Sequence, residues 1–189
     1  FAKYWVHNGF VNIEQEKMSK SLGNFFTIRE VLERYQPEVL RLFLLSSHYR
    51  SPVDFSRESM AEAERGLERL YQTVGHIEER VGLVTEKGVL PTGEGSEFKE
   101  LRDLIEAASG RFQEEMDDDF NTAQAVATLF DLAREINRYD GKDIEADEAR
   151  QALKELGGVM GLTFQEREAP PLETELLVQT SASIYQELN

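Results

Sequence analysis

The sequence has no cysteine, which excludes a disulfide framework and a thiolate metal site within this chain. It also lacks any apolar run near the ~20 residues that a membrane-spanning helix needs, so we expect no membrane span. The opening stretch Phe1–Trp5 has neither an initiator methionine nor the layout of a signal peptide, and we expect the chain to be part of a longer one. The lack of cysteine fits a cytoplasmic protein.

Positive charge is scarce as well, because 36 acidic residues outnumber 21 Lys and Arg and give a net charge of −15. That balance disfavours a general nucleic-acid-binding surface. The charge is unevenly distributed, however, since residues 1–50 carry a net +2 and residues 51–189 a net −17. Phosphate binding is therefore plausible in the first 50 residues, whereas the acidic remainder could touch RNA only through local basic patches.

What the positive end does contain is the pentapeptide Lys17-Met18-Ser19-Lys20-Ser21. The preceding residues 10–14 alternate like a short strand, and a helical pattern begins at Ile28, so the pentapeptide is expected in an exposed loop between a strand and a helix. Ammonium groups, hydroxyls and free backbone N–H groups in such a loop suit a phosphate chain. On charge alone, a solvated Lys/Ser turn is the more common interpretation.

Apolar periodicity predicts a mainly α fold: an antiparallel helical bundle preceded by a small α/β portion. Thr27 and Glu30 form a capping-box pattern, and Pro37 suits the first turn of a nearly all-round apolar helix that we expect to be buried. Residues 1–8 resemble the end of a helix closed by Gly9. The four principal helices are expected near 57–81, 97–116, 122–139 and 145–160, with Ser56 and Asn121 as N-caps and residues 82–96 as a flexible connector.

Other polar groups receive structural interpretations. Asp117-Asp118-Asp119 lacks the ligand spacing of a calcium loop, so these acids are expected to close one helix and to charge the start of the next. His7 and His48 are interpreted as packing or hydrogen-bonding residues and His76 as a surface residue. The arginines of the first 50 residues could contact RNA or form ion pairs, and the structural role is favoured for each: Arg29, Arg34, Arg41 and Arg50.

The pentapeptide is also, letter for letter, the second signature of class I aminoacyl-tRNA synthetases. Its continuation, residues 22–32, together with residues 43–52 and 116–122, resembles cysteinyl-tRNA synthetases in order from residue 1 to about 162. This resemblance favours a phosphate-binding loop over a solvated Lys/Ser turn. It implies an enzyme that activates cysteine with ATP and esterifies the cysteine tRNA. It further implies a catalytic-domain end and stem-contact segment over 1–55, a helical tRNA-binding domain over 56–162, and a linker with a short tail over 163–189.

Carried over by position, Lys20 is the family's ATP-contacting lysine and Lys17 supports the phosphates, so these two are the implied catalytic residues. Met18, Ser19 and Ser21 are implied to shape the loop. The family's first signature and the zinc that selects the cysteine thiol are not matched by any stretch of this sequence, so zinc is expected only in the full-length enzyme and the chain alone is expected to be inactive. A monomer is expected.

Two alternatives stay open at this stage. A paralogous ligase that transfers cysteine to an amino sugar would share the fold and the signature, although Phe25-Phe26-Thr27 and the helical region favour the synthetase. A free-standing helical RNA-binding module is the other alternative, and the intact phosphate signature argues against it.

Overall fold

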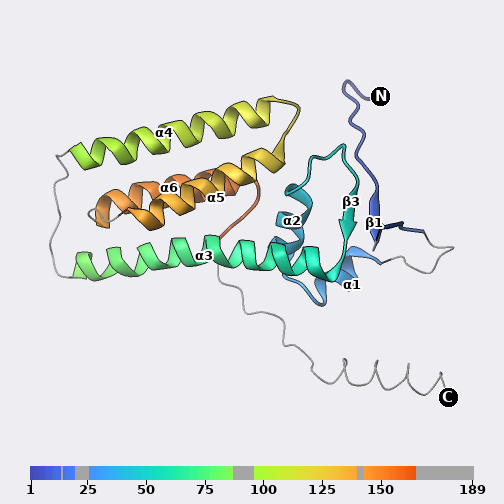
Figure 1. Ribbon diagram of the computed structural model, residues 1–189, viewed down its shortest axis with the longest axis horizontal. Coiled ribbons are helices and arrows are strands. Elements are labelled where there is room, and N and C mark those ends of the chain that lie inside the picture. The colour runs from blue at the N-terminus through green and yellow to red at the C-terminus, as the bar shows by residue number, and fades with distance from the viewer. Residues whose placement is uncertain (14, 20–25, 87–95, 140–142, 165–189) are drawn as a thin grey trace, which may run out of the picture.

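A computed structural model describes residues 1–13, 15–19, 26–86, 96–139 and 143–164. The described chain is mainly helical, with a small sheet at one end of a helical bundle (Figure 1). The expected mainly α fold is therefore confirmed. Side chains of residues 80, 82–86, 96–98 and 143–145 lie outside this description, as do the expected linker and tail beyond residue 164.

The sheet has three short strands in the order β2-β1-β3. Strand β1, Val11–Ile13, confirms the expected strand and pairs antiparallel with β2, Glu16–Lys17, and parallel with β3, Val53–Phe55. Strand β3 was not predicted, because three residues after Ser51-Pro52 are too few to show an alternating pattern. Nonlocal pairing with β1 creates it.

Two helices connect β2 to β3. Helix α1, Ile28–Leu32, begins with the expected capping box, in which Thr27 and Glu30 bond reciprocally. Helix α2, Pro37–Leu45, begins at the expected proline. The prediction that α2 is buried all round was wrong, since Leu44 remains 43% exposed. The fully buried residues of α2 are Val39, Leu42 and Phe43, and Leu40 and Leu45 are partly buried against the core.

Four long helices follow: α3 Arg57–Glu86, α4 Ser96–Asp117, α5 Thr122–Arg138 and α6 Asp143–Val159. They alternate in direction, and α5 and α6 lie between α3 and α4 (Figure 1). Ser56 accepts from the backbone N–H of Ser59 at the start of α3, and Asn121 accepts from that of Gln124 at the start of α5, so both expected N-caps are confirmed.

The core is one continuous apolar cluster that includes residues of α2 as well as of the bundle. The regular apolar positions predicted for α3 are confirmed, because all but the last are buried and that one is half-buried: Met60, Ala63, Leu67, Leu70, Val74, Ile77 and Val81. Helix α6 contacts each of the other three long helices, so its small buried residues Ala146 and Ala149 allow close packing.

Two local predictions were wrong. Residues 1–8 form no helix, because Tyr4, Trp5 and Val6 are all well exposed and a one-turn helix needs a packed face to persist. Gly9 does not close a helix either: its N–H donates to the Tyr49 carbonyl at 2.7 Å, and a Cβ there would lie 2.1 Å from the Ser51 oxygen.

The predicted start of the connector, residue 82, was wrong, because α3 continues through Gly82 to Glu86. A glycine costs a helix only about 1 kcal/mol, which propagation of a long helix readily offsets. Residues 87–95 lie outside the described part of the chain.

Candidate functional site

The signature begins inside the sheet rather than in a loop. Lys17 is the last residue of β2 and pairs with Asn12 of β1, and the Met18 N–H donates to the Val11 carbonyl at 3.3 Å. The interpretation of the whole pentapeptide as a loop was therefore wrong for its first residue. Backbone pairing overrides the turn-like composition of the segment.

The hairpin that precedes the signature is fixed to the sheet at two points. Gln15 lies in the left-handed region, with φ of 68°, and its N–H donates to the Asp54 carboxylate of β3 at 2.7 Å. The Lys17 ammonium lies 4.3 Å from the centroid of the Phe10 ring. Such a cation–π contact restrains a long side chain, so the structure holds this ammonium beside the sheet edge although the residue is exposed.

Of the other implied site residues, Met18 and Ser19 are half-buried, and Met18 is the one bonded to β1. Lys20 and Ser21 lie outside the described residues. The structure therefore places Lys17 and Met18 at the sheet, with Ser19 next to them in the chain.

A second polar cluster joins the loop before β3 to the turn between α4 and α5. The Arg50 guanidinium contacts both oxygens of Asp119, with Nε 2.8 Å from Oδ2 and Nη2 3.0 Å from Oδ1. The Tyr49 hydroxyl donates to Oδ1 at 2.8 Å and accepts from Arg50 Nε at 2.7 Å. His48 stacks on Tyr49 with ring centroids 4.9 Å apart.

These contacts shift the acid–base equilibria of both partners. Hydrogen bonds from Tyr49 and Arg50 lower the pKa of Asp119, and the bond to Asp119 raises the pKa of Arg50. The cluster is exposed, so its value lies in orientation: it ties the bundle to the segment that leads into β3. The acidic triplet therefore does more than was expected of it, because Asp117 ends α4 while Asp119 reaches across to Arg50.

The structure resolves most of the remaining side-chain interpretations. Arg50 has the structural ion pair that was favoured, and His48 has the packing and hydrogen-bonding role. His76 is at the surface as expected. His7 was interpreted as a packing or hydrogen-bonding residue, and because it is exposed the packing alternative was wrong. Sequence reasoning missed the contacts of Asp54 and Asp119, which bond to residues 39 and about 70 positions away.

Within the described residues, no group of three or more His, Cys, Asp or Glu is placed to hold a metal ion. These residues therefore do not fit a zinc site. No helix in the same described part is long and apolar enough to cross a membrane.

Two family descriptions match the chain in the order in which these elements occur. Residues 1–65 match "tRNA synthetases class I (C) catalytic domain", and residues 111–165 match "DALR domain". The first range contains the whole sheet and the described part of the signature, and the second contains the Asp119 turn with α5 and α6. The first third of the chain is thus similar to the catalytic domain of class I aminoacyl-tRNA synthetases.

Curated relatives show a closer similarity within that class. A cysteine–tRNA ligase of Geobacter metallireducens is 52% identical over 89% of this chain and 35% of its own length. One from Methylococcus capsulatus is 50% identical over 89% of this chain and 33% of its own length. The chain is thus about 50% identical to cysteine–tRNA ligases over most of its length, and it spans about a third of the length of the curated relatives it matches.

A solved structure agrees at the level of fold. The LeuRS–tRNA–LeuAMS ternary complex from Agrobacterium radiobacter K84 superposes with a TM-score of 0.62 at 22% identity. The match covers 90% of this chain and 24% of that one. At this identity the likeness supports the fold, with the sheet and the bundle present together.

Proposed function

We propose that the chain is the part of a cysteine–tRNA ligase that carries the ATP-phosphate loop and a helical tRNA-binding domain. The longer enzyme activates cysteine with ATP and transfers it to the cysteine tRNA in the cytoplasm, acting as a monomer. The observation that supports this most is identity near 50% that extends over both the signature segment and the bundle. A paralogue with a different acceptor would have less reason to retain the bundle.

Lys20 and Lys17 have the proposed role of stabilising the ATP phosphates while charge moves onto pyrophosphate. The placement of Lys17 at the sheet edge, restrained over Phe10, supports a preorganised ammonium. Met18, Ser19 and Ser21 have the proposed role of shaping the backbone around those phosphates. The domain boundaries proposed are 1–55, 56–162 and 163–189. Zinc belongs to the longer enzyme in this proposal.

The experiment is single-turnover kinetics in the longer enzyme, with adenylate formation and transfer to tRNA measured separately. Lys20→Ala should slow adenylate formation by about two to three decades, since one such donor contributes roughly 3–4 kcal/mol in the transition state. Cysteine affinity should change little. Lys17→Ala should do similar but smaller harm, and Lys20→Arg should restore little activity because a planar guanidinium is not a compact ammonium.

Transfer from preformed adenylate is the internal control, because the pyrophosphate has already left at that stage. An adenylate rate within about twofold of wild type in Lys20→Ala would refute the role of this lysine. A larger effect on transfer than on activation would do the same. The 189-residue chain by itself should give no cysteine-dependent ATP–pyrophosphate exchange, and exchange by the pure chain would contradict the expected need for further catalytic segments.

A further inference from the structure

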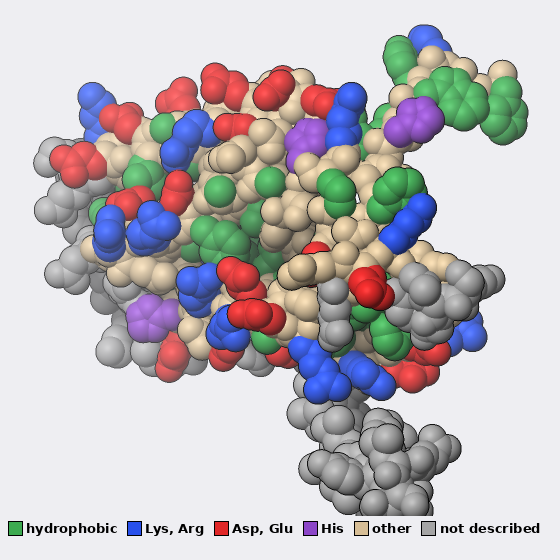
Figure 2. All heavy atoms as spheres, turned by 45° about the vertical axis from the view of Figure 1, so that its right-hand side comes forward, with side chains coloured by type: hydrophobic (Ala, Val, Ile, Leu, Met, Phe, Trp, Pro, Cys, Tyr) green, Lys and Arg blue, Asp and Glu red, His purple; other side chains and the backbone are tan. Residues whose placement is uncertain are grey.

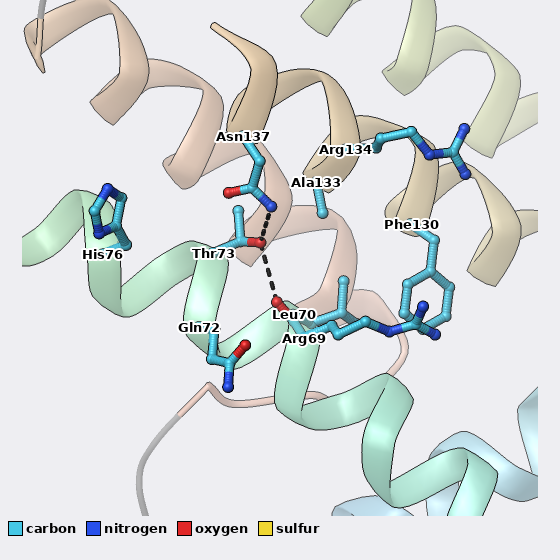
Figure 3. Close-up of a pocket in the computed structure, with 9 residues that line it drawn as sticks. All are labelled: Arg69, Leu70, Gln72, Thr73, His76, Phe130, Ala133, Arg134 and Asn137. Atoms are coloured by element: carbon cyan, nitrogen blue, oxygen red, sulfur yellow. Dashed lines mark hydrogen bonds between the residues drawn. The ribbon is translucent and has the colours of Figure 1, made fainter. Parts of the chain in front are cut away.

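A pocket of about 550 Å³ lies between α3 and α5, and apart from the surface residue His76 its lining includes none of the residues discussed above as site residues. Figure 3 shows the side chains that line it, contributed by both helices. Arg69, Phe130 and Arg134 lie toward one end and His76 toward the other. The lining set is Arg69, Leu70, Gln72, Thr73, His76, Phe130, Ala133, Arg134 and Asn137.

The charge of this lining departs from that of the chain. Acidic residues outnumber Lys and Arg by 36 to 21 overall, and Figure 2 shows both signs interspersed over the visible face of the bundle. Yet the nine lining residues include two arginines and one histidine and no carboxylate. On a chain of net charge −15, a polyanion can be held only where positive side chains gather locally.

The two guanidinium groups are restrained before any ligand arrives. Arg69 lies over the Phe130 ring, with Cζ 5.3 Å from the ring centroid. That contact restrains the guanidinium, and a guanidinium has five N–H donors with which it can bind an oxyanion. Arg134 is held by Asp131 through Nη1 at 3.0 Å, which occupies only part of its donor set.

The floor of the pocket is polar and fixed. Thr73 is 2% exposed, and its hydroxyl donates to the Arg69 carbonyl at 3.0 Å and accepts from the Asn137 amide at 2.8 Å, as the dashed lines in Figure 3 show. This chain of hydrogen bonds links α3 to α5 within the pocket. It fixes the two helices that carry Arg69 and Arg134 relative to each other.

We propose that this pocket binds a phosphate group of an RNA backbone, with Arg69 and Arg134 as its donors. The proposal rests on the proposed function and deepens it, because it assigns the bundle a definite contact with tRNA. Restrained guanidinium groups suit the planar, bidentate recognition of phosphate oxygens. Phe130, which is half-buried beside Arg69, offers an aromatic ring to an unstacked base next to that phosphate.

The test is fluorescence anisotropy of a labelled cysteine tRNA transcript titrated with the 189-residue chain at several salt concentrations. Arg69→Gln and Arg134→Gln should each weaken binding about tenfold, as expected for loss of a hydrogen bond to a charged group. The double variant should lower the slope of log Kd against log salt by about 1, since one phosphate contact is lost. Arg69→Lys should recover only part of the loss, because the charge returns without the planar fork.

Arg102→Gln is the matched control. The Arg102 side chain is 59% exposed and ion-paired to Glu148, and the Arg134 side chain is 57% exposed and ion-paired to Asp131. Arg102 lies on α4, however, and does not line the pocket. It should leave both the affinity and the salt slope unchanged. Thermal melts of every variant show whether the bundle remains folded.

The outcomes separate the two levels of the proposal. If the wild-type chain binds tRNA and the folded double variant binds it equally well, the proposed phosphate site in the pocket is overturned. The proposed function is then left intact. Wild-type chain that does not bind tRNA at all would overturn both. A competition arm with ATP and inorganic pyrophosphate identifies the phosphate source, because selective displacement of tRNA by ATP would overturn an RNA backbone as the occupant.

Discussion

Gly157 and Gly158 are neighbours near the end of α6, and the structure predicts opposite effects for the same substitution at the two positions. A Cβ at Gly157 would lie 2.5 Å and 2.8 Å from two ring atoms of Phe164. A Cβ at Gly158 would meet nothing within 4 Å. Alanine should therefore be tolerated at one position and rejected at the other.

Phe164 cannot move aside freely. The chain leaves α6 through Gly161, whose φ of 75° favours glycine, while the N–H groups of Gly161 and Leu162 bond back to the carbonyls of Gly158 and Gly157. The Thr163 N–H then donates to Glu38 of α2 at 3.0 Å. The Phe164 ring packs edge-on against Tyr71, with centroids 5.8 Å apart, and is only 9% exposed.

The magnitudes follow from these contacts. Gly158→Ala should stabilise the fold by up to about 1 kcal/mol, through helix propensity and a less flexible unfolded chain. Gly157→Ala makes the same gain but overpacks the Phe164 site, which costs about 1–3 kcal/mol. The two variants should thus differ in the free energy of unfolding by about 1–3 kcal/mol, with Gly157→Ala the less stable.

Urea denaturation of both variants measures the difference directly. The double variant Gly157→Ala, Phe164→Ala supplies the second test, because removing the ring should abolish the clash, and the two changes should then couple favourably in a double-mutant cycle. Equal stabilisation by both glycine substitutions would refute the reasoning. Additive effects in the cycle would refute the assignment of the clash to Phe164.

Further predictions concern the core, the first helix and the polar cluster. Leu70→Ala removes a fully buried side chain and should lower the free energy of unfolding, measured in urea, by about 2–5 kcal/mol. Leu32→Ala, at a position that is 36% exposed, should lower it far less. Similar losses for the two variants would contradict the described core. Thr27→Ala should cost about 1 kcal/mol, seen as faster amide exchange in α1, because it removes the capping box; unchanged exchange would argue against that cap. Asp119→Asn should destabilise the fold at pH 7, where the carboxylate is ionised. Because the pKa of Asp119 is lowered from 3.8, this contribution is present above pH 3.8 and is lost as the pH falls through the lower folded-state value. The difference between wild type and variant in urea should therefore vanish in acid, and a pH-independent difference would count against the ion pair.

The sequence was sufficient for the elements whose signals are local. The regular apolar spacing of α3 predicts a buried face, and Thr27, Pro37, Ser56 and Asn121 predict helix starts within a residue or two. Each of these signals acts over a few residues along one helix. The letter-for-letter signature likewise predicted the family before any geometry was known.

What failed depends on partners far apart in the chain. Strand β3 forms because it pairs with one edge of β1. Lys17 belongs to β2 because β2 pairs with the other edge of β1. The Asp119 contacts join positions about 70 residues apart, which no local pattern could reveal. The helix predicted over residues 1–8 is missing for a different reason: the apolar side chains Tyr4, Trp5 and Val6 are all well exposed in the described structure.

The short sheet leads directly into α3, the longest of the described helices. Strand β3 ends at Phe55, Ser56 caps α3, and α3 then runs for 30 residues, or about 45 Å at 1.5 Å per residue. A tilt of about 5° at the sheet would move the far end of such a rod by roughly 4 Å. Since β1 is bonded to both β2 and β3, the signature segment that begins in β2 is connected through the sheet to the start of α3.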